Sequence, residues 1–454
     1  MSRGTVLSWL LRHATAVLAC SVLADLLMAV FVESSRDLQV YYHASPQLLH
    51  GHLYDFELAP PDRESRSLPF TYPPFAAVVL LPLSLLPWPL TVLLWHMASL
   101  AAIALLVHRS FSLLSRAPVP DRRYVVLWTA PALWLEPVRH ALGLGQIGPI
   151  LTALTLYGAT HPRAAAAGGW TGVLAGIKLT PAVNGLYFLA SGRWRAALHA
   201  AGAFTTTVAL AWILSPGQSL RFWGSALADT RRVGAVGGTE NQSLAGCLAR
   251  LTGHPDGPPA PLLTVVLCVT AALTATALIA AVRRHDVLGA VIGVQFFGLL
   301  ACPISWSHHW IWALCAMIRL AHGPTRHTLR AKTALGAWVA ATAGWLVLVL
   351  HTHPQLAAHW PRAFAAAACV YPLCAVLTLA VIASLAFVPS GSRAGRRHVR
   401  SRVGPTWAGF PAGAVRERQG EHGGGQGEPF LWSSPYEGGP GCSCLTRWKT
   451  SRAA

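Results

Sequence analysis

The stretch PLLTVVLCVTAALTATALIAAV, residues 261–282, runs without a charged side chain and is followed directly by Arg283 and Arg284. About 20 apolar residues are enough to cross the hydrocarbon core of a bilayer as an α-helix. Comparable runs recur between residues 5 and 388, whereas the alternating strands of a membrane β-barrel are not seen. The sequence therefore predicts an all-α, polytopic membrane protein with about 10 to 12 transmembrane helices.

The composition supports the same fold class and narrows the partners. Of the 454 residues, 53% are hydrophobic and 11% are charged, whereas a soluble domain carries about 25% charged residues. The net charge of +18 comes with no basic stripe interleaved with aromatic residues, so nucleic acid is not an expected partner. The nine cysteines form no CxxC pair, and no metal site is expected from them.

Basic loops orient the predicted spans, because loops rich in Lys and Arg stay in the cytoplasm. Placing the basic loops inside leaves residues 33–70, 143–146, 215–260, 303–309 and 352–362 outside. Two segments break a simple alternation: 168–190 is predicted to be a broken or re-entrant helix, and 74–87 a partial insertion. The predicted full spans are 14–32, 88–107, 124–142, 146–160, 196–214, 261–282, 287–303, 309–321, 333–351 and 363–388.

The chain is predicted to have two parts. Residues 1–388 form the transmembrane domain, with a long first external loop at 33–70 and a second at 215–260. Residues 389–454 contain thirteen glycines, with ten basic and four acidic side chains. Such a segment cannot bury enough apolar surface to offset chain entropy, which predicts a disordered cytoplasmic tail. Its first arginines are expected to contact anionic membrane lipids.

Unusual polar residues collect in four clusters on the predicted external side. Independent loops that meet on one face of a bundle are expected to form the walls of one site. The alternative is that external loops are polar simply because they meet water. The clusters are Asp37-Leu38-Gln39-Val40-Tyr41-Tyr42, Gly145-Gln146, Asn241-Gln242-Ser243 and Ser305-Trp306-Ser307-His308-His309-Trp310.

Asp37 is the candidate general base. It follows the first span directly and precedes an aromatic pair. A carboxylate close to the low dielectric of a membrane can have a pKa suited to proton transfer. The alternative is an N-cap for the helix that follows, because Asp is a favoured capping residue. The sequence leaves both interpretations open.

Cationic side chains near these clusters are candidates for holding an anion. Lys178 lies in an otherwise apolar segment, where a charge is costly and is by default a functional candidate. His308 and His309 can donate hydrogen bonds to a phosphate, but adjacent histidines on a helix do not chelate one metal by themselves. Arg139 precedes the 143–146 turn. The alternative for Lys178 and the histidines is a side chain that reaches the membrane interface.

These motifs, in this order, resemble glycosyltransferase family 87, a GT-C-fold family of membrane mannosyltransferases. The similarity covers about residues 30–320 and leaves the tail unmatched. One departure is Gly148, where the family pattern leads us to expect Asn. Besides the four clusters, the matching residues are Gly51, Leu53-Tyr54-Asp55, Phe70-Thr71-Tyr72-Pro73-Pro74, Gly176-Ile177-Lys178-Leu179-Thr180-Pro181, Leu244, Arg250 and Pro303-Ile304.

The resemblance implies a hexosyltransferase that acts on the outer face of the plasma membrane. Its donor would be a polyprenyl-phosphate-linked sugar, usually mannose, and its acceptor a hydroxyl of a glycolipid or polysaccharide. Asp37 would be the catalytic base of an inverting transfer, and neither a metal nor a cofactor would be required. The residues expected to bind the phosphate or the sugar of the donor are His308, His309, Lys178, Arg139, Gln146, Asn241, Gln242, Ser305, Tyr41 and Tyr42.

Two other classes of membrane protein remain as alternatives. A secondary transporter or lipid-linked sugar flippase would also place charges in the membrane, but it predicts paired ionisable groups near the bilayer midplane. A non-enzymatic scaffold would explain neither Lys178 nor the histidine pair. The polar groups in this sequence gather on one predicted face, which favours the transferase.

Overall fold

The computed structural model describes residues 3–31, 34–60, 67–114, 122–359 and 361–387, so the predicted tail at 389–454 lies outside the described residues. The described chain is mostly helical. Its one sheet pairs β1 (Glu57–Leu58) with β2 (Leu68–Pro69) in antiparallel register, Glu57 opposite Pro69. Within the described residues, six helical stretches are long and apolar enough to cross a membrane. The predicted all-α, polytopic membrane fold is confirmed.

The apolar helices fall into two length classes. The long ones are α1 (Arg3–Phe31), α4 (Trp88–Leu114), α10 (Trp194–Leu214), α14 (Ala260–Arg283), α17 (Leu329–Ala343) continued by α18 (Leu346–Thr352), and α21 (Val370–Ala383) continued by η6 (Ser384–Phe387). The shorter ones are α3 (Pro74–Leu80), α7 (Gly148–Ala159), α8 (Ala164–Ile177), α15 (Val287–Ala301) and α16 (Trp312–His322).

Short helices and turns make the connections between these apolar helices. They are α2 (Arg36–Ala44), η1 (Ser45–Leu48), η2 (Leu81–Leu85), α5 (Arg122–Ala132), α6 (Glu136–Gly143), η3 (Thr180–Val183), α9 (Asn184–Ala190), α11 (Pro216–Arg221), η4 (Phe222–Ala226), α12 (Thr230–Val233), α13 (Leu244–Thr252), η5 (Ser307–His309), α19 (Gln355–His359) and α20 (Pro361–Ala367).

Three predicted continuous spans are broken in the structure, and one of them, 363–388, divides into α20 and α21 at residues 368–369. The 124–142 segment divides into α5 and α6, with Pro131 inside α5 and Pro137 in the first turn of α6. Proline lacks the N–H that a continuing helix needs, which explains the break. The 333–351 segment divides at Trp345, whose φ is +51°. The 74–87 segment forms α3 and η2, which together are too short to cross a bilayer alone.

The predicted break in 168–190 occurs at Lys178, which ends α8 in an extended conformation with φ −146°. A seam of small residues holds α8 against α10. A Cβ added to Gly168 or Gly172 would lie 2.3 Å from a backbone oxygen of α10, and one added to Gly176 would lie 2.2 Å from the Thr207 hydroxyl. Glycines at this spacing let two membrane helices approach closely. This contact fixes the end of α8 and therefore the position of Lys178.

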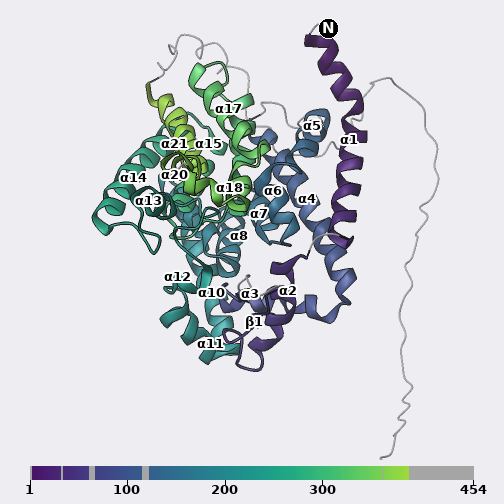
Figure 1. Cartoon of the computed structure of the whole chain (residues 1–454), viewed down its shortest axis with the longest axis vertical. Helices are drawn as coiled ribbons and strands as arrows, with labels where there is room; N and C mark the ends of the chain where they lie inside the picture. Colours follow the sequence, from purple (N-terminus) through teal and green to yellow (C-terminus); the bar gives the residue numbers. More distant parts are fainter. Residues whose placement is uncertain (1–2, 32–33, 61–66, 115–121, 360, 388–454) are drawn as a thin grey trace, which may run out of the picture. The chain divides into compact units, whose positions relative to one another are not determined.

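The apolar residues form two cores. The larger core joins α4, α7, α15, α16, α17 and α21, and the smaller one packs α2, η1 and α3 against α7 and α8. α1 and α4 lie side by side (Figure 1). α2, α3, β1 and α11 gather at one end of the described bundle (Figure 1), and this end carries the candidate site.

Candidate active site

The site is built where the 143–146 turn meets the start of α2. The Asp37 backbone N–H donates to the Leu144 carbonyl at 2.9 Å. Gly145 makes this approach possible, because its φ is +67° and an added Cβ would lie only 2.7 Å from the Leu38 Cβ. The residue that precedes α2 is Ser35, and Asp37 lies within the first turn. The alternative that Asp37 is an N-cap is therefore wrong.

Gln146 connects Asp37 to two tyrosines. Its Nε2 donates to Asp37 Oδ2 at 2.5 Å. Its Oε1 accepts hydrogen bonds from the Tyr41 hydroxyl at 3.2 Å and the Tyr72 hydroxyl at 3.1 Å. The two hydroxyls lie 2.9 Å apart. This network fixes the amide of Gln146, so its N–H groups point to Asp37 and orient the carboxylate.

The surroundings of Asp37 favour proton uptake. Burial raises the pKa of its carboxyl above the usual 3.8, while the Gln146 hydrogen bond and the positive charges of Lys178, His140 and Arg36 oppose this rise. A carboxylate that is partly stripped of water yet held by a donor is a stronger base than one in solvent.

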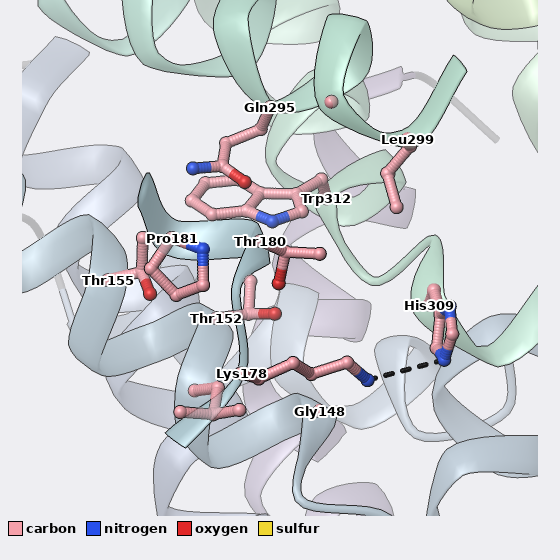
Figure 2. A pocket seen from close by; sticks show the side chains of 12 residues that line it. Gly148, Thr152, Thr155, Lys178, Thr180, Pro181, Gln295, Leu299, His309 and Trp312 are labelled. Atoms are coloured by element: carbon pink, nitrogen blue, oxygen red, sulfur yellow. Dashed lines mark hydrogen bonds between the residues drawn. The ribbon is translucent and has the colours of Figure 1, made fainter. Parts of the chain in front are cut away.

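Lys178 faces the same network from the end of α8. Its Nζ lies 3.3 Å from His309 Nε2 and 5.2 Å from the centre of the Tyr72 ring. Figure 2 shows the lysine extended toward His309, with both side chains among those that line a cavity. The structure thus brings residues of α2, the 143–146 turn, α8 and η5 into one place, as the single-site hypothesis requires.

A cavity of about 500 Å³, counting the space open to solvent at its mouth, lies next to this pair. Apolar and hydroxyl side chains line it, with the Gln295 amide and the Trp312 ring at the end away from Lys178 (Figure 2). A mostly apolar cavity with a few convergent polar groups suits a ligand with an apolar chain and a polar head. The other lining residues are Gly148, Leu151, Thr152, Thr155, Thr180, Pro181, Gly298 and Leu299.

Three histidines, His140, His308 and His309, form a cluster beside the cavity. The ring of His308 lies 4.7 Å from that of His309 and 5.2 Å from that of His140, centre to centre. His308 is only 6% exposed, and neither ring nitrogen has a hydrogen-bond partner among the described residues. The ring of His308 is nearly perpendicular to the rings of His140 and His309. His308 therefore retains donor capacity for a bound group.

Glu136 holds the histidine cluster in place through its contacts with His140 and Ser307. It is fully buried and accepts hydrogen bonds from Ser307 Oγ at 2.7 Å and the Tyr371 hydroxyl at 2.5 Å. His140 Nδ1 lies 3.3 Å from Glu136 and its Nε2 lies 3.7 Å from Glu240. These contacts tie α6 and η5 to the start of α21.

Arg139 points elsewhere than predicted. It is 4% exposed and forms an ion pair with Asp25 of α1. The other oxygen of Asp25 lies 3.2 Å from His96 Nδ1 on α4. Asp25 of α1 therefore links Arg139 of α6 to His96 of α4 inside the bundle, and no hydrogen bond or ion pair among the described residues joins Arg139 to the Lys178–His309 pair.

The amides predicted to bind donor instead hold loops together. Asn241 donates to the carbonyls of Val236 and Pro303. Gln242 donates to Ala368 at 2.7 Å and accepts from the backbone N–H of Tyr371 at 3.2 Å.

Two further candidates have similar structural partners. Ser305 donates to the Leu299 carbonyl at 2.7 Å. Tyr42 donates to the Leu86 carbonyl at 2.8 Å and packs its ring on Trp88. Both hydroxyl groups are therefore used within the fold, whereas Asp37, Tyr41, Gln146, Lys178, His308 and His309 come together.

Sequence reasoning passed over Asp25 and Glu136. Both are carboxylates within apolar segments, and the rule that drew attention to Lys178 applies to them equally. In the sequence, Tyr72 stands out only as part of a motif, because nothing local shows that its hydroxyl reaches Gln146. Among the described residues, no three His, Cys, Asp or Glu side chains cluster as metal ligands.

Comparison of the sequence with known proteins identifies the family of the chain. The model of glycosyltransferase family 87 matches residues 70–303. A polyprenol-phosphate-mannose-dependent alpha-(1-2)-phosphatidylinositol pentamannoside mannosyltransferase of Mycolicibacterium smegmatis is 37% identical over 394 residues, which cover 84% of this chain and 93% of that protein.

A second type of relative is more distant. A polyprenol-phosphate-mannose-dependent alpha-(1-2)-phosphatidylinositol mannoside mannosyltransferase of Mycobacterium tuberculosis is 35% identical over 327 residues, covering 69% of this chain and 76% of that protein. No solved structure matches the chain. The extent of the family match and of these identities shows that the chain belongs to glycosyltransferase family 87.

Proposed function

We propose that this membrane protein transfers mannose from polyprenyl-phosphate-mannose to a hydroxyl of a phosphatidylinositol mannoside. The observation that carries the proposal is the convergence of the Asp37 carboxylate and the Lys178–His309 pair on one network at the mouth of a cavity. A base and a cation beside an apolar cavity suit an acceptor hydroxyl and a lipid phosphate. The names of the relatives support both substrates.

Asp37 acts as the general base in one displacement. It accepts the proton of the acceptor hydroxyl while that oxygen forms a bond to the anomeric carbon of mannose. The bond from this carbon to the phosphate oxygen breaks, and the polyprenyl phosphate leaves with the electron pair. A β-linked donor then gives an α-linked product, in agreement with the alpha linkage in the names of the relatives.

Lys178, His308 and His309 stabilise the leaving phosphate. Its oxygens gain charge as the bond breaks, and donors already in position lower the barrier because they need not reorganise. No general acid is needed, since an alkyl phosphate leaves in its ionised form. The polyprenyl chain would run from Lys178 along the cavity toward Gln295 and Trp312 (Figure 2).

We place this reaction at the outer face of the plasma membrane, where the positive-inside pattern puts the loops that carry the site. A transporter or flippase would use paired charges inside the bundle, and the Asp25–Arg139 pair is of that kind. The family match favours the transferase, and the ion pair is then a structural element.

The test is a transfer assay with the purified full chain in lipid nanodiscs. The donor is radiolabelled polyprenyl-phosphate-mannose, and the acceptors are a phosphatidylinositol mannoside and, in parallel, a soluble mannose oligosaccharide. Labelled, α-mannosidase-sensitive glycolipid is the expected product. The full chain is also reconstituted in sealed vesicles, and donor carried across their membrane without any labelled glycolipid in either preparation would contradict the proposal and support the flippase.

A further inference from the structure

Two cysteines and an arginine meet where α13 packs against α20 and Cys369 lies in the turn between α20 and α21. Cys247 is 5% exposed and Cys369 is 4% exposed, and the Cys369 sulfur lies 3.8 Å from the Cys247 carbonyl oxygen. One nitrogen of Arg250, Nη2, lies 3.8 Å from the sulfur of Cys247 and 3.9 Å from that of Cys369. The two sulfurs thus share a cationic neighbour in a buried place.

Backbone contacts hold the two thiols in register. Arg250 donates to the Ala368 carbonyl at 2.8 Å, and Gln242 donates to the same carbonyl at 2.7 Å. On the other side of Cys369, the N–H of Tyr371 donates to Gln242 at 3.2 Å. The chain around Cys369 is therefore fixed to the segment that carries Cys247 from both directions. The approach of the sulfurs follows from this packing.

The two thiols differ in acidity. The neighbouring Cys247 and the charge of Arg250 lower the pKa of Cys369 to about 7. The neighbouring Cys369, with burial, raises the pKa of Cys247. Cys369 also precedes the first turn of α21, where a helix N-terminus favours a thiolate. In the packed pair, Cys369 is therefore the more acidic of the two thiols.

We propose that Cys247 and Cys369 form a disulfide that fastens α13 to the start of α21. The oxidant is a protein disulfide of the thiol–disulfide oxidoreductase class in the external compartment. One of the two cysteines, as its thiolate, attacks one sulfur of that disulfide and releases a thiolate on the oxidant. The other cysteine loses its proton and attacks the sulfur of the first, releasing the second thiolate. Two thiols lose two protons and two electrons, and the oxidant gains them.

Burial sets the order of events. Both sulfurs are covered in the folded chain, so exchange with a protein oxidant precedes the packing of α13 on α20. The proposal rests on the proposed function in one respect, the external location of this face. An oxidising compartment is where structural disulfides form and persist.

The bond would stabilise one wall of the active site. Glu240, Asn241 and Gln242 lie just before α13, and Glu240 contacts His140 of the histidine cluster at 3.7 Å. A disulfide at Cys247 keeps this segment against α21 when the acceptor enters and leaves.

The experiment is redox mapping of the full chain. Membranes are denatured in N-ethylmaleimide without reductant, digested and analysed by mass spectrometry. The expected result is a cross-linked Cys247–Cys369 peptide pair, while Cys374 of α21, also buried, is alkylated. Recovery of Cys247 and Cys369 as alkylated thiols would overturn the proposal.

A thermal measurement supplies a second readout. Reductant should lower the Tm of the wild-type chain by about 5 °C or more and leave that of the Cys247→Ser/Cys369→Ser variant unchanged. Equal shifts in both proteins would also overturn the proposal.

A labelling control separates this proposal from the proposed topology. Asp256 is exposed in the loop after α13, and a membrane-impermeant maleimide should label Asp256→Cys on intact cells. Free Cys247 and Cys369 thiols with a labelled Asp256→Cys would refute the disulfide alone. Free thiols with an unlabelled Asp256→Cys would also refute the proposed outer-face location.

Discussion

Lys178 influences Asp37 through charge, and this gives the site a testable pH dependence. A base works only when it is ionised, so kcat/KM falls as pH decreases through the Asp37 pKa. Burial raises this pKa and the Lys178 charge lowers it. Lys178→Met should therefore move the acidic limb of kcat/KM upward by on the order of 1 pH unit. Lys178→Arg, which keeps the charge, should leave the limb in place, and coinciding limbs for both variants and the wild type would refute the coupling.

Removing single tyrosine hydroxyls distinguishes a residue of the site from a structural neighbour. Tyr72→Phe removes one of the two hydrogen bonds that fix the Gln146 amide, and a buried hydrogen bond contributes about 1 kcal/mol. Transfer should fall roughly fivefold. Tyr42→Phe is the matched control, because its hydroxyl bonds the Leu86 carbonyl. A larger loss in Tyr42→Phe than in Tyr72→Phe would mean that the donor lies on the other side of α2.

The sequence could single out Asp37, Gln146, Lys178 and His309 because each is polar in an apolar or interfacial setting. It could not tell which polar groups remain available after folding. Asn241 resembles a ligand in sequence, yet backbone carbonyls occupy its amide. The local sequence pattern shows which type of side chain stands at a position. Its hydrogen-bond partners come from segments far away in the chain, which the pattern does not reveal.

At the scale of elements, the Gly145 turn decides whether Gln146 reaches Asp37. Gly145→Ala puts a Cβ 2.7 Å from that of Leu38 at a φ of +67°, which forces the turn away from α2. Misplacement by about 1 Å can cost on the order of 10²-fold in rate. We expect a loss of that size in kcat, measured against equal amounts of inserted protein.

The matched control is Gly169→Ala in α8, where an added Cβ meets nothing within 4 Å. This variant should keep wild-type transfer. Full activity in Gly145→Ala would show that the contact between the turn and α2 is dispensable.

The ion pair of Asp25 and Arg139 is predicted to stabilise the packing of α1 on α6. Asp25→Asn removes a carboxylate that pairs with the buried guanidinium of Arg139, and breaking a buried ion pair costs about 3–5 kcal/mol. The thermal midpoint in detergent should fall. The double variant Asp25→Asn/Arg139→Gln should recover part of it, because neither charge then remains.

Donor binding distinguishes this role from the one predicted from the sequence. If Arg139 only stabilises the bundle, the double variant should bind polyprenyl-phosphate-mannose as the wild type does. Loss of donor binding in a folded double variant would return Arg139 to the phosphate site.

For the whole molecule, the hydrophobic pattern was sufficient to predict the helical class and most spans. The pattern failed where proline or a positive φ interrupts an apolar run, as at Pro131 and Trp345. It could predict the break at Lys178 because a charge within an apolar run is visible in the sequence. The close contact between α8 and α10 depends on which glycines face the neighbouring helix, and a single sequence does not show this.

The central claim is that Asp37 removes the proton from the acceptor. Asp37→Asn keeps the shape and can still accept the Gln146 hydrogen bond, but it cannot take up a proton at neutral pH. The most direct measurement is single-turnover transfer of mannose by this variant at saturating donor, with donor binding measured separately and the exposed Asp256→Asn variant as control. We predict unchanged donor binding and a rate lower by about 10²–10⁴-fold. Transfer by Asp37→Asn at the rate of the wild type would contradict the account.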